Sequence, residues 1–121
     1  MEFYRAIKKP MSSGELQSAI KITDLPSYCA SIYEVTHDDG DQGEISCVWG
    51  VFSIYREVIK HGLRFSMPGC PNALAWTITA EKGDNEILLH LTINREEHDE
   101  EFIESIVQFA DDWQAGLSRL G

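Results

Sequence analysis

The last quarter of the chain carries an uninterrupted apolar stripe, which limits the folds open to the rest of the sequence. Its residues recur at spacings of three and four, which predicts one long amphipathic helix within Asn94–Leu120. Asn94 and Glu97 fit a capping box at its start. A stripe this large must be buried against another layer, which only the preceding segments can supply. The stripe comprises Phe102, Ile103, Ile106, Val107, Ala110, Trp113, Leu117 and Leu120.

The clearest strand pair predicted from the sequence joins residues 74–80 to residues 87–93. Apolar and polar residues alternate in both segments, and a two-residue turn at Gly83-Asp84 aligns them as a hairpin. The same register places Thr77 opposite His90 on the other face. The apolar pairs that this register predicts are Ala80–Ile87, Ile78–Leu89, Trp76–Leu91 and Leu74–Ile93.

Three further strands are predicted over residues 29–37, 44–59 and 63–67. Residues 51–59 also fit a helix ending before Gly62, but β-branched and aromatic residues favour a strand with a bend at Gly50. A turn at His61-Gly62 would join this strand to the next. The pairs expected from these registers are His37–Gly43, Val35–Ile45, Tyr33–Cys47, Val58–Phe65 and Arg56–Met67.

The sequence of the N-terminal part of the chain indicates fewer helices and strands than the rest. Residues 2–8 fit either a short edge strand or a tail. Ser12 and Glu15 form a second capping-box pattern, which predicts a helix over residues 13–22 that ends before Pro26. The predicted fold is α+β: an antiparallel sheet of about five strands, a long C-terminal helix packed on one face and a short N-terminal helix. At 121 residues, the sequence predicts a single domain spanning 1–121.

Charge and cysteine content narrow the classes of function. The net charge is −10, and residues 73–121 contribute three basic and eleven acidic side chains. This sign disfavours nucleic-acid binding. No apolar run reaches the length of a membrane span, and the N-terminal residues lack the apolar region of a signal peptide. The three cysteines fit no zinc or disulfide framework, so we expect a reducing, cytoplasmic location.

Four residues are candidate ligand contacts. Cys70 lies in a proline- and glycine-rich loop, and His61 is the nearest histidine along the chain. A thiol becomes a nucleophile only where a cation or a helix N-terminus lowers its pKa. Thr77 and His90 face one another in the predicted hairpin and could line a polar strip. The sequence contains no metal-ligand grouping or cofactor fingerprint, so we predict no cofactor and leave catalysis open.

Two functional hypotheses follow. The first is a small, acidic, soluble, non-catalytic interaction module of adaptor, chaperone-like or toxin-neutralising type that docks onto a basic protein. The second is a small-molecule-binding protein or enzyme with a cavity between the sheet and the C-terminal helix, using Thr77, His90, Cys70 and His61. A homodimer is also possible through apolar side chains left uncovered by the sheet. The residues considered for that patch are Val48, Phe52, Tyr55, Phe65 and Leu88.

Overall fold

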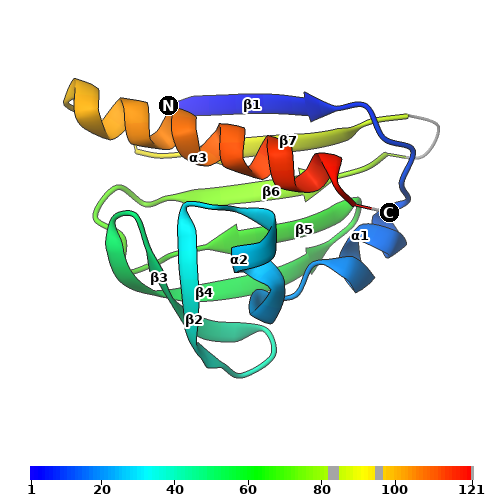
Figure 1. Cartoon of the computed structure of the whole chain (residues 1–121), viewed down its shortest axis with the longest axis horizontal. Coiled ribbons are helices and arrows are strands. Elements are labelled where there is room, and N and C mark those ends of the chain that lie inside the picture. The colour runs from blue at the N-terminus through cyan, green and yellow to red at the C-terminus, as the bar shows by residue number, and fades with distance from the viewer. Residues whose placement is uncertain (82–84, 95–96, 121) are drawn as a thin grey trace.

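The computed structural model describes residues 1–81, 85–94 and 97–120, which form one antiparallel sheet and a set of helices on one of its faces (Figure 1). The α+β fold with a C-terminal helix is therefore confirmed. The sheet has seven strands in the order β1-β7-β6-β5-β4-β3-β2, so the prediction of about five is wrong. The elements in chain order are β1 (Glu2–Ile7), α1 (Ser13–Ala19), the 3₁₀ turn η1 (Ile22–Asp24), α2 (Leu25–Tyr28), β2 (Ile32–Asp38), β3 (Gln42–Cys47), β4 (Gly50–Ile59), β5 (Gly62–Ser66), β6 (Ala75–Thr79), β7 (Ile87–Thr92) and α3 (Glu100–Ser118).

Two segments account for the additional strands. Residues 2–7 form β1, which pairs along its length with β7. The segment predicted as one strand over 44–59 is a hairpin of β3 and β4, in which Cys47 pairs with Gly50. Gly50 has a φ of +126°, a conformation that favours glycine, so the chain turns back here instead of merely bending. The helical alternative for 51–59 is also wrong.

The β6–β7 register agrees with the prediction. Ile78 pairs with Leu89 and Trp76 with Leu91, and Thr77 faces His90. The predicted turn at Gly83-Asp84 lies outside the described residues. These pairs place alternate side chains of both strands in the core and leave the others on the opposite face.

The β4–β5 register is shifted from the prediction. Val58 pairs with Leu63 and Arg56 with Phe65, because the turn is at residues 60–61 and not at His61-Gly62. Gly62 instead begins β5, where an added Cβ would lie 2.0 Å from the carbonyl oxygen of Ile78. Close approach of two strands, not a turn conformation, requires this glycine. The shift is two residues, so the buried face is unchanged.

The β2–β3 register agrees at Val35–Ile45 and differs on either side. His37 pairs with Glu44, not Gly43, and Cys47 pairs with Ile32, not Tyr33. Register shifts occur between Ile32 and Glu34 and again between Val35 and His37. Such irregularities break the strict two-residue alternation on which the prediction rested.

The helix boundaries correct two expectations and agree with a third, because the first helix does end before Pro26. The capping box of Ser12 and Glu15 is present, but α1 ends at Ala19 instead of residue 22. Pro26 lies in the first turn of the short helix α2, a position that tolerates proline. Asn94 does not cap α3. The cap is Asp99, whose Oδ1 accepts from the Phe102 amide at 2.8 Å.

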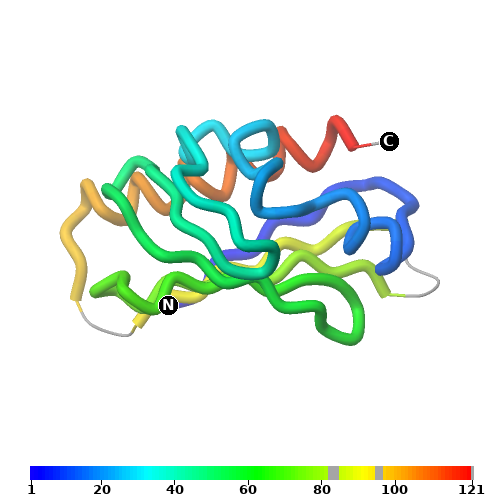
Figure 2. Tube along the Cα trace, turned by 90° about the horizontal axis from the view of Figure 1, so that it is seen from below, coloured from blue at the N-terminus to red at the C-terminus, as the bar shows by residue number. Residues whose placement is uncertain are grey.

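α3 and α2 cover the same face of the sheet, as the view along the layer shows (Figure 2). Trp113 and Leu117 of the predicted stripe are fully buried, as is Phe109, which the stripe did not include. Gly116 allows α3 to approach α2: a Cβ there would lie 1.7 Å from the Tyr28 carbonyl oxygen. No helix in the described part of the chain combines the length and apolarity needed to cross a membrane.

Buried Arg56 connects three parts of the fold. Its side chain is 4% exposed, and Nε donates to the Ile20 carbonyl at 2.9 Å. One terminal nitrogen donates to the Gln17 carbonyl at 2.6 Å and the other to Asp41 Oδ1 at 3.0 Å. Arg56 thus holds the C-terminal end of α1 against β4 and the β2–β3 turn.

Candidate functional site

The layer between the sheet and α3, where a cavity was considered from the sequence, is filled by aromatic side chains. The ring of Trp76 lies 5.1 Å from that of Phe109 and 6.1 Å from that of Trp113, measured between centroids. All three side chains are at most 1% exposed. The indole N–H groups of Trp76 and Trp113 are buried and have no hydrogen-bond partner among the described residues. The layer is therefore close-packed but not fully satisfied in hydrogen bonding.

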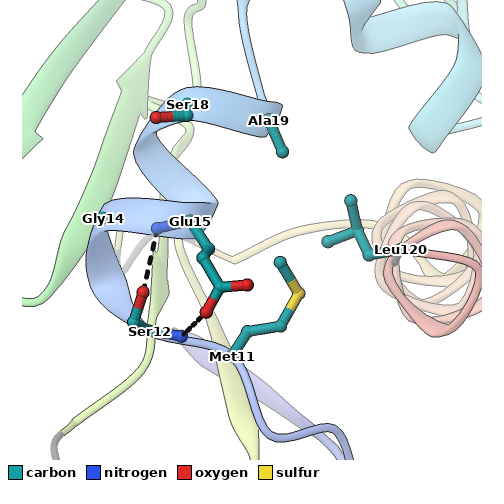
Figure 3. A pocket seen from close by; sticks show the side chains of 7 residues that line it. All are labelled: Met11, Ser12, Gly14, Glu15, Ser18, Ala19 and Leu120. Atoms are coloured by element: carbon teal, nitrogen blue, oxygen red, sulfur yellow. Dashed lines mark hydrogen bonds between the residues drawn. The ribbon is translucent and has the colours of Figure 1, made fainter.

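A groove of about 610 Å³ lies at one end of this layer, between α1 and the C-terminal end of α3. Met11, Ala19 and Leu120 extend their side chains towards the same space (Figure 3). The N-cap and the exposed side of α1 complete the lining with Ser12, Gly14, Glu15 and Ser18. The groove is open to solvent, and its volume is similar to that of small-molecule sites, which usually combine an apolar centre with a few polar groups.

Local hydrogen bonds fix both walls of the groove. On the α1 side, the Ser12 hydroxyl accepts from the Glu15 amide, and Glu15 Oε1 accepts from the Ser12 amide, each at 3.1 Å. On the α3 side, Lys9 Nζ donates to the carbonyl oxygen of Ser118 at 2.9 Å and also to that of Leu120. An ammonium is favoured at this position because carbonyls at a helix C-terminus lack intrahelical donors.

A second, smaller depression lies on the face of the sheet opposite α3. It has a volume of about 180 Å³ and includes both Thr77 and His90, as the predicted hairpin required. Because these two side chains point away from α3, they cannot line a cavity between the sheet and that helix. Their role in ligand binding stays a prediction. The complete lining is Arg64, Ala75, Trp76, Thr77, His90 and Thr92.

His90 is held in place by two residues of β1. Its ring stacks on Tyr4, with centroids 4.4 Å apart and an interplanar angle of 1°. Its Nε2 lies 2.9 Å from Glu2 Oε1. Neither contact follows from the sequence, because the β1–β7 pairing that creates both was not assigned there.

The other two predicted contacts are separate from this depression and from each other. His61 precedes β5 and Cys70 follows it, so the length of a five-residue strand, about 16 Å, separates them. Cys70 is 8% exposed, in a turn where its amide donates to the Met67 carbonyl at 2.9 Å. The structure therefore does not bring Cys70 and His61 into one site with Thr77 and His90.

All three cysteines are free and buried. Burial raises the pKa of the Cys29 thiol to about 12 and also raises the pKa of Cys47. Both shifts favour the neutral thiol over the reactive thiolate. Within the described residues, no three or more His, Cys, Asp or Glu side chains are grouped so as to hold a metal ion.

The residues considered for a homodimer patch are not all exposed. Phe65 is fully buried against Trp76, and Phe52 packs partly buried against the core. Val48, Tyr55 and Leu88 are exposed by 42%, 39% and 38%. The inclusion of Phe65 is wrong, and the homodimer itself stays a prediction.

Arg64 and the groove residues were missed at the level of sequence. Arg64 faces Thr77 across the β5–β6 pair, a pairing that the sequence did not assign. Met11 and Leu120 are more than 100 positions apart, and only the finished fold brings them together. The alternation Leu63-Arg64-Phe65 did indicate that Arg64 faces away from the core, and this was the one usable signal.

Comparison with known proteins identifies the fold and nothing more specific. No protein-family model and no curated protein sequence matches the chain. A START-superfamily protein from Mycobacterium smegmatis has a similar structure, with a TM-score of 0.64 and 10% identity over 100% of this chain and 98% of that chain. An uncharacterised protein from Bacillus thuringiensis has a TM-score of 0.61 and 15% identity over 97% of this chain and 98% of that chain. Both likenesses concern the fold alone.

Proposed function

We propose that this protein is a small-molecule-binding protein that takes a mostly apolar ligand in the groove between α1 and the C-terminal end of α3. The observation that carries the proposal is the groove itself, about 610 Å³ around Met11, Ala19 and Leu120. The site replaces the cavity considered between the middle of α3 and the sheet, where aromatic rings occupy the space.

The lining of the groove determines the kind of ligand. Three apolar side chains converge on its centre, and burial of apolar ligand surface there contributes about 25 cal/mol per Å². Ser18 also lines the groove, with its hydroxyl directed away from Met11 and Leu120 (Figure 3). The Glu15 carboxylate disfavours an anionic group on the ligand, and it is already hydrogen-bonded to the Ser12 amide. A neutral, compact, apolar molecule with a hydroxyl or amide group fits this lining best.

The fold supports the same proposal. Its similarity to the START-superfamily protein extends over the whole chain, and START-like folds often bind small molecules. At 10% identity this similarity supports the arrangement of strands and helices but gives no information on the ligand. The ligand class above is therefore argued from this chain's own residues.

The test is a thermal-shift screen with neutral apolar metabolites, followed by titration of any compound that stabilises the protein. A ligand at 100 times its Kd adds about 2.7 kcal/mol of stability. Ala19→Leu fills the groove and should remove the effect, whereas Ala115→Leu, at an exposed position of α3, should retain it. The proposal fails if no compound stabilises the protein, or if both variants respond alike.

A second candidate is the non-catalytic interaction module with a basic protein partner. It is favoured by an acidic surface at the start of α3, where Glu97, Asp99, Glu100, Glu101 and Glu104 are all exposed. None of these five carboxylates pairs with a cation within the described part of the chain. Such a surface would steer a positively charged partner at low salt.

The partner hypothesis has its own test. Pull-down at low and high salt should recover a basic protein only at low salt. Replacing Glu100, Glu101 and Glu104 by glutamine should abolish recovery, whereas replacing three exposed carboxylates elsewhere should not. A partner that binds the glutamine variant equally well would contradict the hypothesis. Cytoplasmic location stays a prediction.

A further inference from the structure

We propose that the sheet face opposite α3 carries a separate binding site for a small oxyanion, a carboxylate or a phosphate, centred on Thr77 between Arg64 and His90. This site is independent of the groove between α1 and α3, because the two lie on different faces of the sheet. Its location is the depression of about 180 Å³ on β5, β6 and β7.

The strand registers place the three side chains in one line across the sheet. Arg64 pairs with Thr77, and Thr77 pairs with His90. Neighbouring strands are about 4.8 Å apart, so Arg64 and His90 lie on either side of the short Thr77 side chain, with roughly 10 Å between their backbones. The gap is spanned by a hydroxyl and bounded by a guanidinium and an imidazole. The hydroxyl and the guanidinium can donate hydrogen bonds to a ligand, whereas Nε2 of the imidazole faces Glu2 Oε1 at 2.9 Å.

The charge of the lining distinguishes this depression from the rest of the surface. Among the described residues that line it, Arg64 is the only one with a formal charge, although the chain has twenty acidic and ten basic side chains. Three other hollows formed by described residues each contain at least one carboxylate, from Glu15 in one, Asp39 and Glu44 in another, and Glu81 and Glu86 in the third. Two carboxylates outside the lining, Glu57 and Glu2, already contact Arg64 and His90, so an anion would be bound by the donors that these contacts leave free.

Neighbouring residues hold both flanking groups in place. Glu57 accepts from one terminal nitrogen of Arg64 at 3.0 Å, which leaves the rest of the guanidinium without a partner among the described residues. Tyr4 and Glu2 fix the ring of His90 by stacking and by the 2.9 Å contact to Nε2. Groups fixed before binding lose less conformational entropy when the ligand arrives.

The size of the depression limits the ligand to a few non-hydrogen atoms. Its volume is well below the 300 Å³ at which sites for drug-sized molecules begin. The planar fork of an arginine binds carboxylate and phosphate oxygens in the same way, so the geometry specifies an oxyanion and not its source. Inorganic phosphate and acetate are the smallest probes of the two classes.

The test is an amide NMR titration of the full chain with sodium phosphate and, separately, with sodium acetate, at ionic strength held constant with chloride. We expect saturable shifts at Arg64, Thr77 and His90 with at least one anion. Response to phosphate alone would identify a phosphate site, and response to acetate alone a carboxylate site. Arg64→Gln should weaken binding at least about tenfold, as expected for loss of a charge-assisted contact.

Two further variants make the result specific to the site. Lys8→Gln removes the same charge from a side chain that is 88% exposed, and it should leave the affinity unchanged within about twofold. Thr77→Val keeps the side-chain shape, removes the hydroxyl and should weaken binding several-fold. The inference is overturned if neither anion gives saturable shifts, or if Arg64→Gln and Lys8→Gln have the same effect.

Discussion

Gly116→Ala should destabilise the protein, although alanine is the better helix former. Gly116 lies inside α3 where the helix crosses α2, and an added Cβ would stand 1.7 Å from the Tyr28 carbonyl oxygen and 2.5 Å from its carbon. Ordinary contacts of a Cβ begin at 3.4 Å. The obstructing atoms belong to the backbone, so the two helices must separate by about 1.7 Å, the difference between 3.4 Å and 1.7 Å, to restore an ordinary contact.

The magnitude follows from two opposing terms. Alanine in place of glycine within a helix gains about 1 kcal/mol. Forcing extra volume into a packed contact costs about 1–3 kcal/mol, and more where backbone must move. Separation would also loosen the stack of Tyr28 on Trp113, whose ring centroids are 6.4 Å apart. Because the extra volume displaces backbone as well as core side chains, we expect its cost to exceed the gain in helix propensity and to lower the free energy of unfolding by about 2 kcal/mol.

Gly14→Ala is the matched control. Gly14 lies in α1, where the nearest atom to an added Cβ is Ser12 Oγ at 3.9 Å. This substitution should stabilise the protein by about 0.5–1 kcal/mol, because only the helix term remains. Urea unfolding followed by tryptophan fluorescence and by circular dichroism measures both variants. Midpoints that move in the same direction would refute the close approach of α2 and α3.

Three further substitutions or conditions test other parts of the structure. Arg56→Met should cost about 3–5 kcal/mol, because it leaves two helix-end carbonyls unpaired; Asp41→Asn should cost less than about 1 kcal/mol, since that carboxylate is 71% exposed. If the two variants lowered the urea midpoint by equal amounts, this account of Arg56 would be contradicted. Ser105→Ala should cost about 1 kcal/mol by removing the acceptor 2.7 Å from Trp49 Nε1, and an unchanged melting temperature would exclude that contact. The pKa of Cys29 is raised to about 12 in the folded protein, so between about pH 9 and pH 12 this thiol ionises only in the unfolded state. Its contribution to the free energy of unfolding is therefore complete below about pH 9 and is lost as the pH rises to about 12. The fall in stability over this pH range should be smaller in Cys29→Ala.

Most of the architecture could be predicted from the sequence, because the spacing of apolar residues indicates which side of a helix or strand is buried. The stripe ending at Leu120 and the alternation around Trp76 predicted the helix, the hairpin and the face each buries, and both features are present. The strand count was wrong where local signals were ambiguous. At Gly50, a glycine within an apolar run fitted a bend as well as a turn, and only the pairing of Cys47 with Gly50 distinguishes them.

The candidate sites depended on contacts that no local pattern encodes. The Thr77–His90 pair was predictable because a hairpin register is local. Arg64 joins that pair only through the β5–β6 pairing, and the contacts of Glu2 with His90 require β1 to pair with a strand some 85 positions later. The groove likewise needs both ends of the chain, with Lys9 holding the end of α3.

The measurement that tests the proposed binding function most directly is methyl NMR of methionine-labelled protein during titration with the neutral apolar metabolites. Met11 lines the groove, whereas Met67 is 1% exposed in the core and serves as an internal reference. We predict that at least one compound shifts the Met11 methyl signal to saturation and leaves that of Met67 in place. If no compound moves Met11, or if both signals move together, ligand binding in the groove between α1 and α3 is contradicted.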